Sequence, residues 1–513
     1  MGPLVSVYMA QMTALPSEGN DPTEGLILGQ PPDQDQPRTG TPSGSSGALV
    51  SQELAIDPRQ DAPFYLHPDR VVGFPIDAEH AAICTARALL EGNEMTTTRR
   101  TLTRMGLAAP ALAMMPRGLR AADAPIKIGA PYPLTGVAAS AGTAVKQAIE
   151  VAVDIINNAH PELPNLPLAA TQGLPGLGGR KVEVIFADHQ GNPAIAQSEA
   201  LRLITQDKVT AMVGCYQSSC GLTASAVCER YGIPFMASEA SAPSLTERGF
   251  KWFFRPTPIG TDFGAAYASF LAERKAAGFK IDKVAVINEN TEYGTSTGNA
   301  IIGALKAKGL NADLRIAYNA NSSDVSAQVL QLKDANPDCA IFVSYTSDSI
   351  LFTKTMHTLN WKPPILIGDD SGFSDTAFID AVGDMAQGVF NRSSYDVGKP
   401  GSASYVVNEL FMKHTGHAMD DTSARGMQGF LALMEAINRA GSAEPAKIQA
   451  ALVSQDLKPE QLMIGYNGIK YDAKGQNLLA ATLLVQLTGK KYVAVWPAAS
   501  AVQPPALPYK GWG

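Results

Sequence analysis

The chain has 513 residues, of which 45% are hydrophobic and 17% are charged, so it can bury two or three cores without disulfides or metals. Its formal net charge of −7 excludes the strongly basic surface that nucleic-acid binding requires. The five cysteines form no CxxC pair and no cysteine–histidine cluster, so we expect neither a metal nor a cofactor.

Residues 1–94 differ in composition from the rest of the chain. Residues 16–47 are crowded with Pro, Gly, Asp, Gln and Ser, and they show no hydrophobic period. Such a segment buries too little apolar surface to offset the entropy lost on ordering, so we expect disorder. The alternative is that Met95 is the true start and that residues 1–94 are an over-extended reading of the gene.

Residues 95–124 have the layout of a bacterial export signal. A basic segment with Arg99 and Arg100 precedes an apolar run at 105–115, and alanines follow between 121 and 124. The run is too short to span a bilayer, so cleavage is expected. The paired arginines resemble the signal of the twin-arginine (Tat) export route, which predicts a periplasmic protein. A short amphipathic helix of the folded protein is the alternative.

From residue 126 onward, short apolar runs alternate with amphipathic segments, which is typical of parallel βαβ units. In the first half we predict strands at 126–130, 181–187, 209–214 and 233–237, and helices at 143–158, 193–206 and 222–231. The proline-rich junction near Pro256 interrupts both helix and central strand, and it is therefore the predicted hinge.

The alternation restarts after this junction. The second half has predicted strands at 283–288, 339–345 and 365–368, and predicted helices at 262–277, 298–308 and 325–335. The repeated pattern predicts an α/β protein with two doubly wound parallel-sheet lobes of similar build.

After Gly388 the order of elements changes. Helices are predicted at 402–414, 423–440 and 446–454, followed by a hairpin at 482–486 and 491–496. We infer that the chain returns to the first lobe near 390 and to the second near 475, which gives a three-strand hinge. Lobe 1 would comprise 125–256 and 390–475, and lobe 2 would comprise 257–389 and 476–513. A third independent domain is the alternative.

Three polar loops follow predicted strands, where open parallel sheets bind their ligands. Ser218 and Ser219 open a helix, and hydroxyls with unpaired N–H groups there suit a carboxylate. Residues 238–243 can supply a carbonyl and a hydroxyl, and Asp369 with Asp370 suits an ammonium group. Helix caps and turns explain each loop taken alone. Their shared position at strand ends favours a binding site.

Two tyrosines are expected at the same level of the fold. Tyr345 closes the strand that begins at Cys339, and Tyr293 lies just past the strand ending at Asn288. Aromatic rings at this level can form the wall of a ligand pocket or close over the ligand. Ordinary packing at the lobe surface is the alternative for both.

Several short motifs follow one another along the chain. They are Pro133-Leu134-Thr135-Gly136 with Gly142, Asp188 with Asn192-Pro193, Tyr216-Gln217-Ser218-Ser219 with Ala224-Ser225, Tyr231-Gly232-Ile233-Pro234, Leu245-Thr246-Glu247-Arg248-Gly249-Phe250, Glu292-Tyr293-Gly294 and Gly368-Asp369-Asp370. Together they resemble the type I periplasmic binding proteins for hydrophobic and branched-chain amino acids. The resemblance extends from about residue 126 to the end of the chain.

This resemblance implies the function of the protein. It would be the extracytoplasmic solute-binding component of an ABC importer, capturing a small amino acid by hinge closure and presenting it to a permease in the inner membrane. A monomer is expected. A ligand-sensing regulator of the same fold, binding a short amide or amino acid, is the alternative. We expect no enzyme, since hydrolysis needs a nucleophile with a base and the three loops contain no histidine.

The resemblance also implies roles for individual residues. Ser219 would hold the α-carboxylate of the ligand, while the Ala240 carbonyl and the Ser241 hydroxyl would hold its α-amino group. Asp370 would neutralise the ammonium from the opposite lobe, and the two tyrosines would close over the ligand. Ala141 falls where a relative places an aromatic ring, so the pocket can admit a larger ligand.

The cysteines depart from the family pattern. The cysteine that relatives use in the second loop is absent from residues 189–191, so their disulfide is not carried over. A Cys215–Cys220 bridge would be permitted in an oxidising periplasm, and buried free thiols are the other interpretation.

Overall fold

The computed structural model describes residues 124–369 and 371–512, with the side chain of Ser371 left undescribed. The predicted leader, nearly all of the predicted export signal and the candidate site residue Asp370 lie outside the described residues. None of the helices in the described ranges combines the length and the apolarity needed to cross a membrane.

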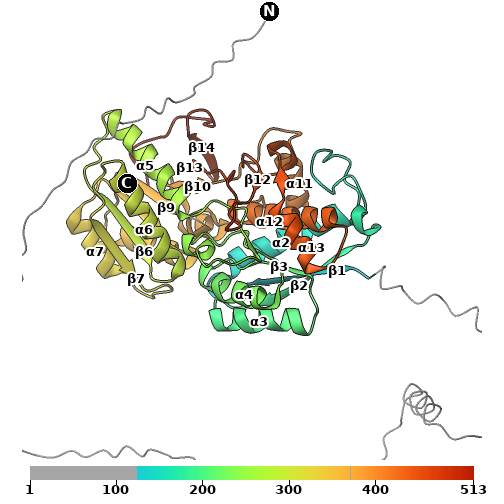
Figure 1. Cartoon of the computed structure of the whole chain (residues 1–513). Helices are drawn as coiled ribbons and strands as arrows, with labels where there is room; N and C mark the ends of the chain where they lie inside the picture. The colour runs from blue at the N-terminus through green and yellow to red at the C-terminus, as the bar shows by residue number, and fades with distance from the viewer. Residues whose placement is uncertain (1–123, 370, 513) are drawn as a thin grey trace, which may run out of the picture. The chain divides into compact units, whose positions relative to one another are not determined.

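Lobe 1 is built on a fully parallel sheet with the strand order β2-β1-β3-β4-β5. Its strands are β1 Ile126–Tyr132, β2 Val182–Asp188, β3 Ala211–Val213, β4 Phe235–Met236 and β5 Phe253–Phe254. Its helices are α2 Ala139–Asn157, α3 Pro193–Thr205, α4 Ser218–Tyr231, α11 Ala403–Thr415, α12 Asp421–Ala440 and α13 Pro445–Val453. In Figure 1, α3 and α4 lie on one side of the sheet and α2 and α12 on the other, as in doubly wound folds.

Lobe 2 is built on a larger sheet with the order β14-β13-β10-β9-β8-β6-β7, in which β13 runs in the direction opposite to all the other strands. Its strands are β6 Val284–Glu289, β7 Leu314–Tyr318, β8 Cys339–Val343, β9 Ile365–Asp369, β10 Phe390–Ser393, β13 Leu483–Thr488 and β14 Lys491–Trp496. Its helices are α5 Gly260–Ala276, α6 Glu292–Ala307, α7 Ser326–Ala335, α8 Thr346–Thr358, α9 Ser371–Ser374 and α10 Thr376–Val382.

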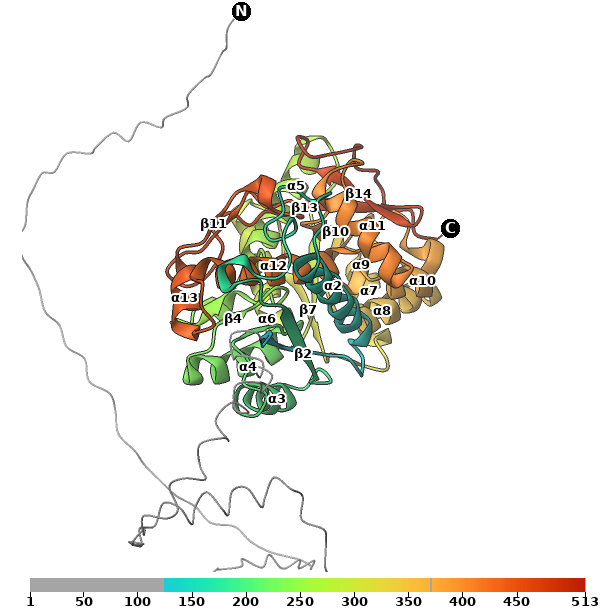
Figure 2. The same ribbon diagram turned by 90° about the vertical axis from the view of Figure 1, so that its right-hand side faces the viewer.

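Short elements complete the two lobes. They are the 3₁₀ turns η2 Pro175–Leu177, η3 Pro243–Thr246, η4 Gly383–Ala386 and η5 Pro459–Gln461, and the strand pair β11 Asp456–Leu457 and β12 Ile469–Lys470. The end of the chain belongs to lobe 2, where Trp512 packs edge-on against His357 of α8. The turned view shows the C-terminus on the side of α10 (Figure 2).

The lobes are joined by three crossings of the chain. The first crossing, at Arg255, and the third, at Gln476, pair as a parallel bridge. The Arg255 N–H donates to the Gly475 carbonyl at 2.8 Å, and the Asn477 N–H donates to the Arg255 carbonyl at 2.9 Å. A Cβ at Gly475 would lie 2.0 Å from the Phe253 carbonyl oxygen, so only glycine allows this approach.

The second crossing lies further along the chain than the sequence analysis placed it. We expected it near residue 390, but β10 pairs with β9 and β13 and is therefore part of lobe 2. The chain leaves lobe 2 only after Ser393. The short polar sequence of β10 gives little sign of a strand, because its polar side chains are buried through partners from elsewhere in the fold.

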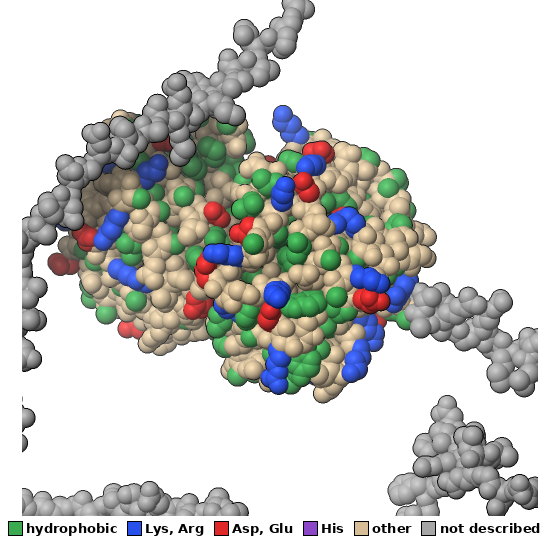
Figure 3. Space-filling model, viewed as in Figure 1, with side chains coloured by type: hydrophobic (Ala, Val, Ile, Leu, Met, Phe, Trp, Pro, Cys, Tyr) green, Lys and Arg blue, Asp and Glu red, His purple; other side chains and the backbone are tan. Residues whose placement is uncertain are grey.

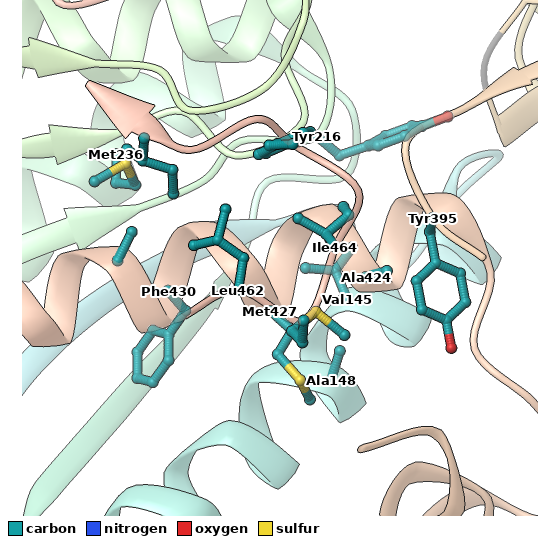
Figure 4. Packing of buried hydrophobic residues seen from close by; sticks show 14 of the residues in the cluster. Val145, Ala148, Tyr216, Met236, Tyr395, Ala424, Met427, Phe430, Leu462 and Ile464 are labelled. Carbon is teal, nitrogen blue, oxygen red and sulfur yellow. The ribbon is translucent and has the colours of Figure 1, made fainter. Parts of the chain in front are cut away.

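Helix α12 forms the centre of lobe 1 and is buried on nearly all sides. Met427 of α12 packs near Val145 and Ala148 of α2 (Figure 4). The close approach of the two helices depends on a small residue, because a Cβ at Gly426 would lie 2.5 Å from Cγ1 of Val145. The apolar faces of α2 and α12 thus bring the start of α12 to the hinge.

The four cysteines in the described part of the chain are buried free thiols, namely Cys215, Cys220, Cys228 and Cys339. The Cys215–Cys220 bridge is therefore not formed. Lysine and arginine side chains are scattered among aspartate and glutamate on the face seen in Figure 3, and no broad basic area lies on it.

Candidate functional site

The loops after the strands of the two lobes meet between the lobes. The Ser244 hydroxyl, in η3 of lobe 1, donates to the Glu292 carboxylate at the start of α6 in lobe 2. At another point, the Ser140 hydroxyl of α2 donates to Asp375, the N-cap of α10, at 2.5 Å. The lobes are therefore in direct polar contact at the ends that carry the predicted site.

Three tyrosines form an aromatic group across this junction. Tyr216 comes from lobe 1 (Figure 4), and its ring centroid lies 5.8 Å from that of Tyr345 in lobe 2. The Tyr345 ring lies 5.4 Å from that of Tyr293, whose hydroxyl donates to the Asp369 carbonyl at 3.1 Å. Burial, reinforced by the nearby Glu289 carboxylate, raises the pKa of Tyr345 well above its usual value. The neutral phenol is therefore the form present at physiological pH.

Two adjacent loops of lobe 1 carry the serines. Ser219 lies partly exposed in the first turn of α4. Ser218 is buried, and its hydroxyl accepts a hydrogen bond from the Ala242 N–H at 3.3 Å, which joins the two loops. Ser241 is 1% exposed, and its hydroxyl has no hydrogen-bond partner among the described residues. A buried hydroxyl without a partner is costly, so this atom is suited to receive a ligand group.

A buried ion network joins the lobes at the second crossing. The Arg392 Nε of β10 donates to Asp369 of lobe 2 at 3.0 Å, and its NH1 donates to Asp421 of α12 in lobe 1 at 2.9 Å. The guanidinium also lies 3.9 Å from the ring centroid of Phe263. All three ionised side chains are almost completely buried. The carboxylate of Asp369 is therefore committed to the hinge.

The same network extends into lobe 1 through Arg425 of α12. Its Nε donates to Asp421 at 2.9 Å, and its NH1 donates to the Glu239 carbonyl at 3.0 Å. The Glu239 side chain in turn accepts from the Tyr132 hydroxyl at the end of β1 at 3.2 Å. The loop that carries Ser241 is thus connected through buried polar groups to the hinge.

Comparison with known proteins identifies the family. A family model described as periplasmic binding protein matches residues 125–491. The chain belongs to the periplasmic binding protein family. The Leu/Ile/Val-binding protein homolog 7 of Brucella abortus is 31% identical over 417 residues, covering 78% of this chain and 99% of that protein. Homolog 8 of Brucella suis is 31% identical over 76% of this chain and 95% of its own length.

Solved structures show the same fold. A leucine binding protein from Thermotoga maritima has a TM-score of 0.62 at 20% identity, covering 72% of this chain and 98% of its own. A solute binding protein from R. palustris in complex with benzoate has a TM-score of 0.62 at 17% identity, with 74% and 97% covered. The predicted fold of two doubly wound lobes with a triple crossing is thereby confirmed as that of periplasmic binding proteins.

The periplasmic binding protein fold places most of the predicted site residues in one region. Ser218, Ser219, Ala240 and Ser241 lie on joined loops of lobe 1, and Tyr293 and Tyr345 lie together in lobe 2. The Ala240 carbonyl already accepts from Arg255 at 3.2 Å. Tyr216 was not predicted as a site residue, although its position after a strand end is a signal that could have identified it.

This periplasmic binding protein also contains a Gly-x-Ser-x-Gly pattern at residues 294–298, which hydrolases use at a sharp strand-to-helix turn. Here Ser296 lies in the second turn of α6, and its hydroxyl donates to the Glu292 carbonyl at 2.7 Å. The serine thus has the geometry of an ordinary helical serine. The family is one of solute-binding proteins rather than of enzymes.

A groove of about 450 Å³ lies where α2 and α10 face each other, beside the start of α12. Ser140 and Asp375, which join the lobes, line it together with Asp420. Burial, together with the neighbouring Asp375 carboxylate, raises the pKa of Asp420 to about 6. An aspartate in an unfolded chain has a pKa of about 3.9. Asp420 therefore holds its proton more tightly in the folded protein than in the unfolded chain.

This shift predicts a pH-dependent stability. Between about pH 4 and about pH 6 the folded protein binds more protons at Asp420 than the unfolded chain, so stability falls as the pH rises through this range. We expect the free energy of unfolding of the wild type, relative to Asp420→Asn, to decrease over this interval and then to level off. Urea titrations at several pH values measure it. Asp380→Asn is the control, because Asp380 is an exposed residue of the same groove. If the difference in free energy of unfolding between the wild type and Asp420→Asn stayed constant with pH, the raised pKa of Asp420 would be contradicted.

Proposed function

We propose that this periplasmic binding protein is the extracytoplasmic receptor of an ABC importer and captures a small amino acid with a hydrophobic side chain. The Brucella relatives, named as Leu/Ile/Val-binding protein homologs, support this ligand class. So does a structural relative from Desulfitobacterium hafniense in complex with Leu, which has a TM-score of 0.56 at 20% identity and covers 72% of this chain and 99% of its own. The observation that carries the proposal is the buried hydroxyl of Ser241, which has no hydrogen-bond partner in the described part of the chain and lies on a loop at the junction of two hinged lobes.

In this proposal the first lobe recognises the amino-acid backbone. Ser219, at the start of α4, takes the carboxylate, because the first N–H groups of a helix favour an anion. The Ser241 hydroxyl and the Ala240 carbonyl take the amino group. A carbonyl oxygen can accept two hydrogen bonds, so the Arg255 bond to Ala240 leaves one position open. Asp370 completes the site from lobe 2.

The side chain of the ligand would contact the aromatic group of Tyr216, Tyr345 and Tyr293. Aromatic faces suit aliphatic and aromatic groups alike. The small side chain of Ala141, which is buried in the first turn of α2, is proposed to allow a larger ligand. An aromatic carboxylic acid is therefore the second candidate ligand, and the benzoate complex of the R. palustris relative favours it.

Binding is proposed to proceed by closure of the lobes around the ligand. The Ser140–Asp375 and Ser244–Glu292 contacts are those that closure would form. We further infer that residues 95–124 direct export to the periplasm, and that the closed monomer then presents its ligand to an inner-membrane permease.

A thermal-unfolding screen tests the ligand class. Leucine, isoleucine or valine, added at roughly a hundred times its dissociation constant, is expected to raise the free energy of unfolding by about 2.7 kcal/mol. Aspartate and glucose serve as controls and should have no effect. Benzoate is included in the same screen. Stabilisation by benzoate but by none of the three amino acids would replace the amino acid by an aromatic acid as the ligand class. Stabilisation by none of these compounds would contradict the proposal.

A further inference from the structure

Arg255 connects the hinge to the loop that carries Ser241. It is the last residue of lobe 1 before Pro256, and its side chain is completely buried. Its backbone is fixed on both sides by the third crossing, through Gly475 and Asn477. The residue therefore lies at the point where two of the three connections between the lobes are paired.

The guanidinium of Arg255 reaches from this point into the candidate site. Its NH1 donates to the Ala240 carbonyl at 3.2 Å and to the Ala242 carbonyl at 2.7 Å. Its Nε donates to the Gln476 amide oxygen at 2.7 Å, and its NH2 donates to the Thr246 hydroxyl at 2.9 Å. One side chain thus holds the hinge and both carbonyls that flank Ser241.

All four of these acceptors are neutral. Among the described residues, no carboxylate forms an ion pair with Arg255. Burial lowers the pKa of this guanidinium to about 9, against the opposing influence of Asp262. Burying a cation without an ion pair is unfavourable, and an apolar side chain would fill the space at lower cost. A planar fork with several donors is needed, however, to hold acceptors on both segments.

The backbone of the loop is also held by segments other than Arg255. The Ala242 N–H donates to Ser218 at 3.3 Å, and the Ser241 carbonyl accepts from the Gly260 N–H of α5 at 3.1 Å. With the flanking carbonyls held by Arg255, the backbone around Ser241 has little freedom. The direction of the Ser241 hydroxyl is therefore set by groups that themselves belong to the hinge or contact it.

We propose that Arg255 is a positioning residue, which orients the Ser241 loop and transmits movement of the paired crossings to it. The inference rests on the proposed function only in assigning Ser241 to the ligand. When the lobes open, any displacement of Gln476 relative to Arg255 alters the support of the two carbonyls. The conformation of the loop that carries Ser241 is consequently coupled to the conformation of the hinge.

The test uses Gln476→Leu in the whole protein, because leucine has a similar volume but lacks the amide that bonds Arg255. Without ligand, hydrogen exchange of the amides at residues 240–242 and 244–246 is expected to accelerate by about tenfold, since a bond to a charged group is lost. Affinity for the ligand found in the screen is expected to fall by a similar factor. Arg255→Lys keeps the positive charge but lacks the planar guanidinium with its several donors. It should show the same faster exchange and the same loss of affinity.

Lys474→Ala is the matched control. It removes an exposed ion pair to Glu247 at 2.6 Å, which joins nearly the same two segments at the surface, and such pairs contribute little. Exchange of the same amides should stay at the wild-type rate. Wild-type exchange in either Gln476→Leu or Arg255→Lys would overturn the positioning role. A wild type that binds no amino acid would contradict the proposed function instead, because the exchange experiment needs no ligand.

Discussion

Arg392→Ala is expected to lower the free energy of unfolding by about 3–5 kcal/mol. The substitution removes the cation that bonds Asp369 in lobe 2 and Asp421 in lobe 1, and both carboxylates are almost fully buried. It also removes the contact with the ring of Phe263. Removing one partner from a buried ion network leaves charge that water cannot reach, which is why the effect is large.

Urea unfolding at neutral pH measures this loss. Lys447→Ala is the control, because Lys447 forms an exposed i,i+3 pair with Glu444 at the start of α13 and such pairs contribute about 0.2–0.5 kcal/mol. If Arg392→Ala were as stable as this control, the network would have no role in holding the lobes. A second variant, Arg392→Met, keeps much of the side-chain volume and separates the loss of charge from the loss of packing.

Asp370→Ala is expected to weaken amino-acid binding by roughly 2 kcal/mol or more, which is about thirtyfold in the dissociation constant. The residue follows directly after β9 and is the carboxylate proposed to neutralise the ligand ammonium. Without it, the bound cation would be shielded from water and left without an opposite charge. Titration calorimetry with the amino acid identified by the unfolding screen measures the change.

Asp384→Ala supplies the comparison for this experiment, since Asp384 is an exposed aspartate of the same lobe. Its affinity should match that of the wild type. An unchanged affinity in Asp370→Ala would remove the case for an amine-bearing ligand and would favour the aromatic acids. Thermal unfolding of each variant without ligand separates a binding defect from a folding defect.

The two-lobed fold was accessible from sequence because its central strands are short, unbroken apolar runs. β8 and β9 are buried at every position, and amphipathic helices separate the runs. Several elements were missed, among them β7, α8 and β10. β7 alternates buried and exposed residues at the sheet edge, α8 is rich in serine and threonine, and β10 contains Asn391, Arg392 and Ser393. Local propensity favours none of them, so tertiary contacts decide their structure.

The positions of some site residues could also be predicted from the apolar runs. Strand ends and the loops after them can be located from apolar runs, so Ser219, Ser241 and Tyr345 could be assigned to one level of the fold. Their partners could not. The bond from Arg425 to the Glu239 carbonyl joins residues 186 positions apart, and the one from Arg255 to Gln476 joins residues 221 apart. A single sequence carries no signal for such pairs.

The pairing of Arg255 with Gln476 restricts how the lobes can move. Two single strands could swivel independently, whereas two strands that are hydrogen-bonded to each other must move together. Lobe opening should therefore follow a swing with one dominant coordinate. The remaining connection, beyond Ser393, then acts as a tether that limits the amplitude of that swing.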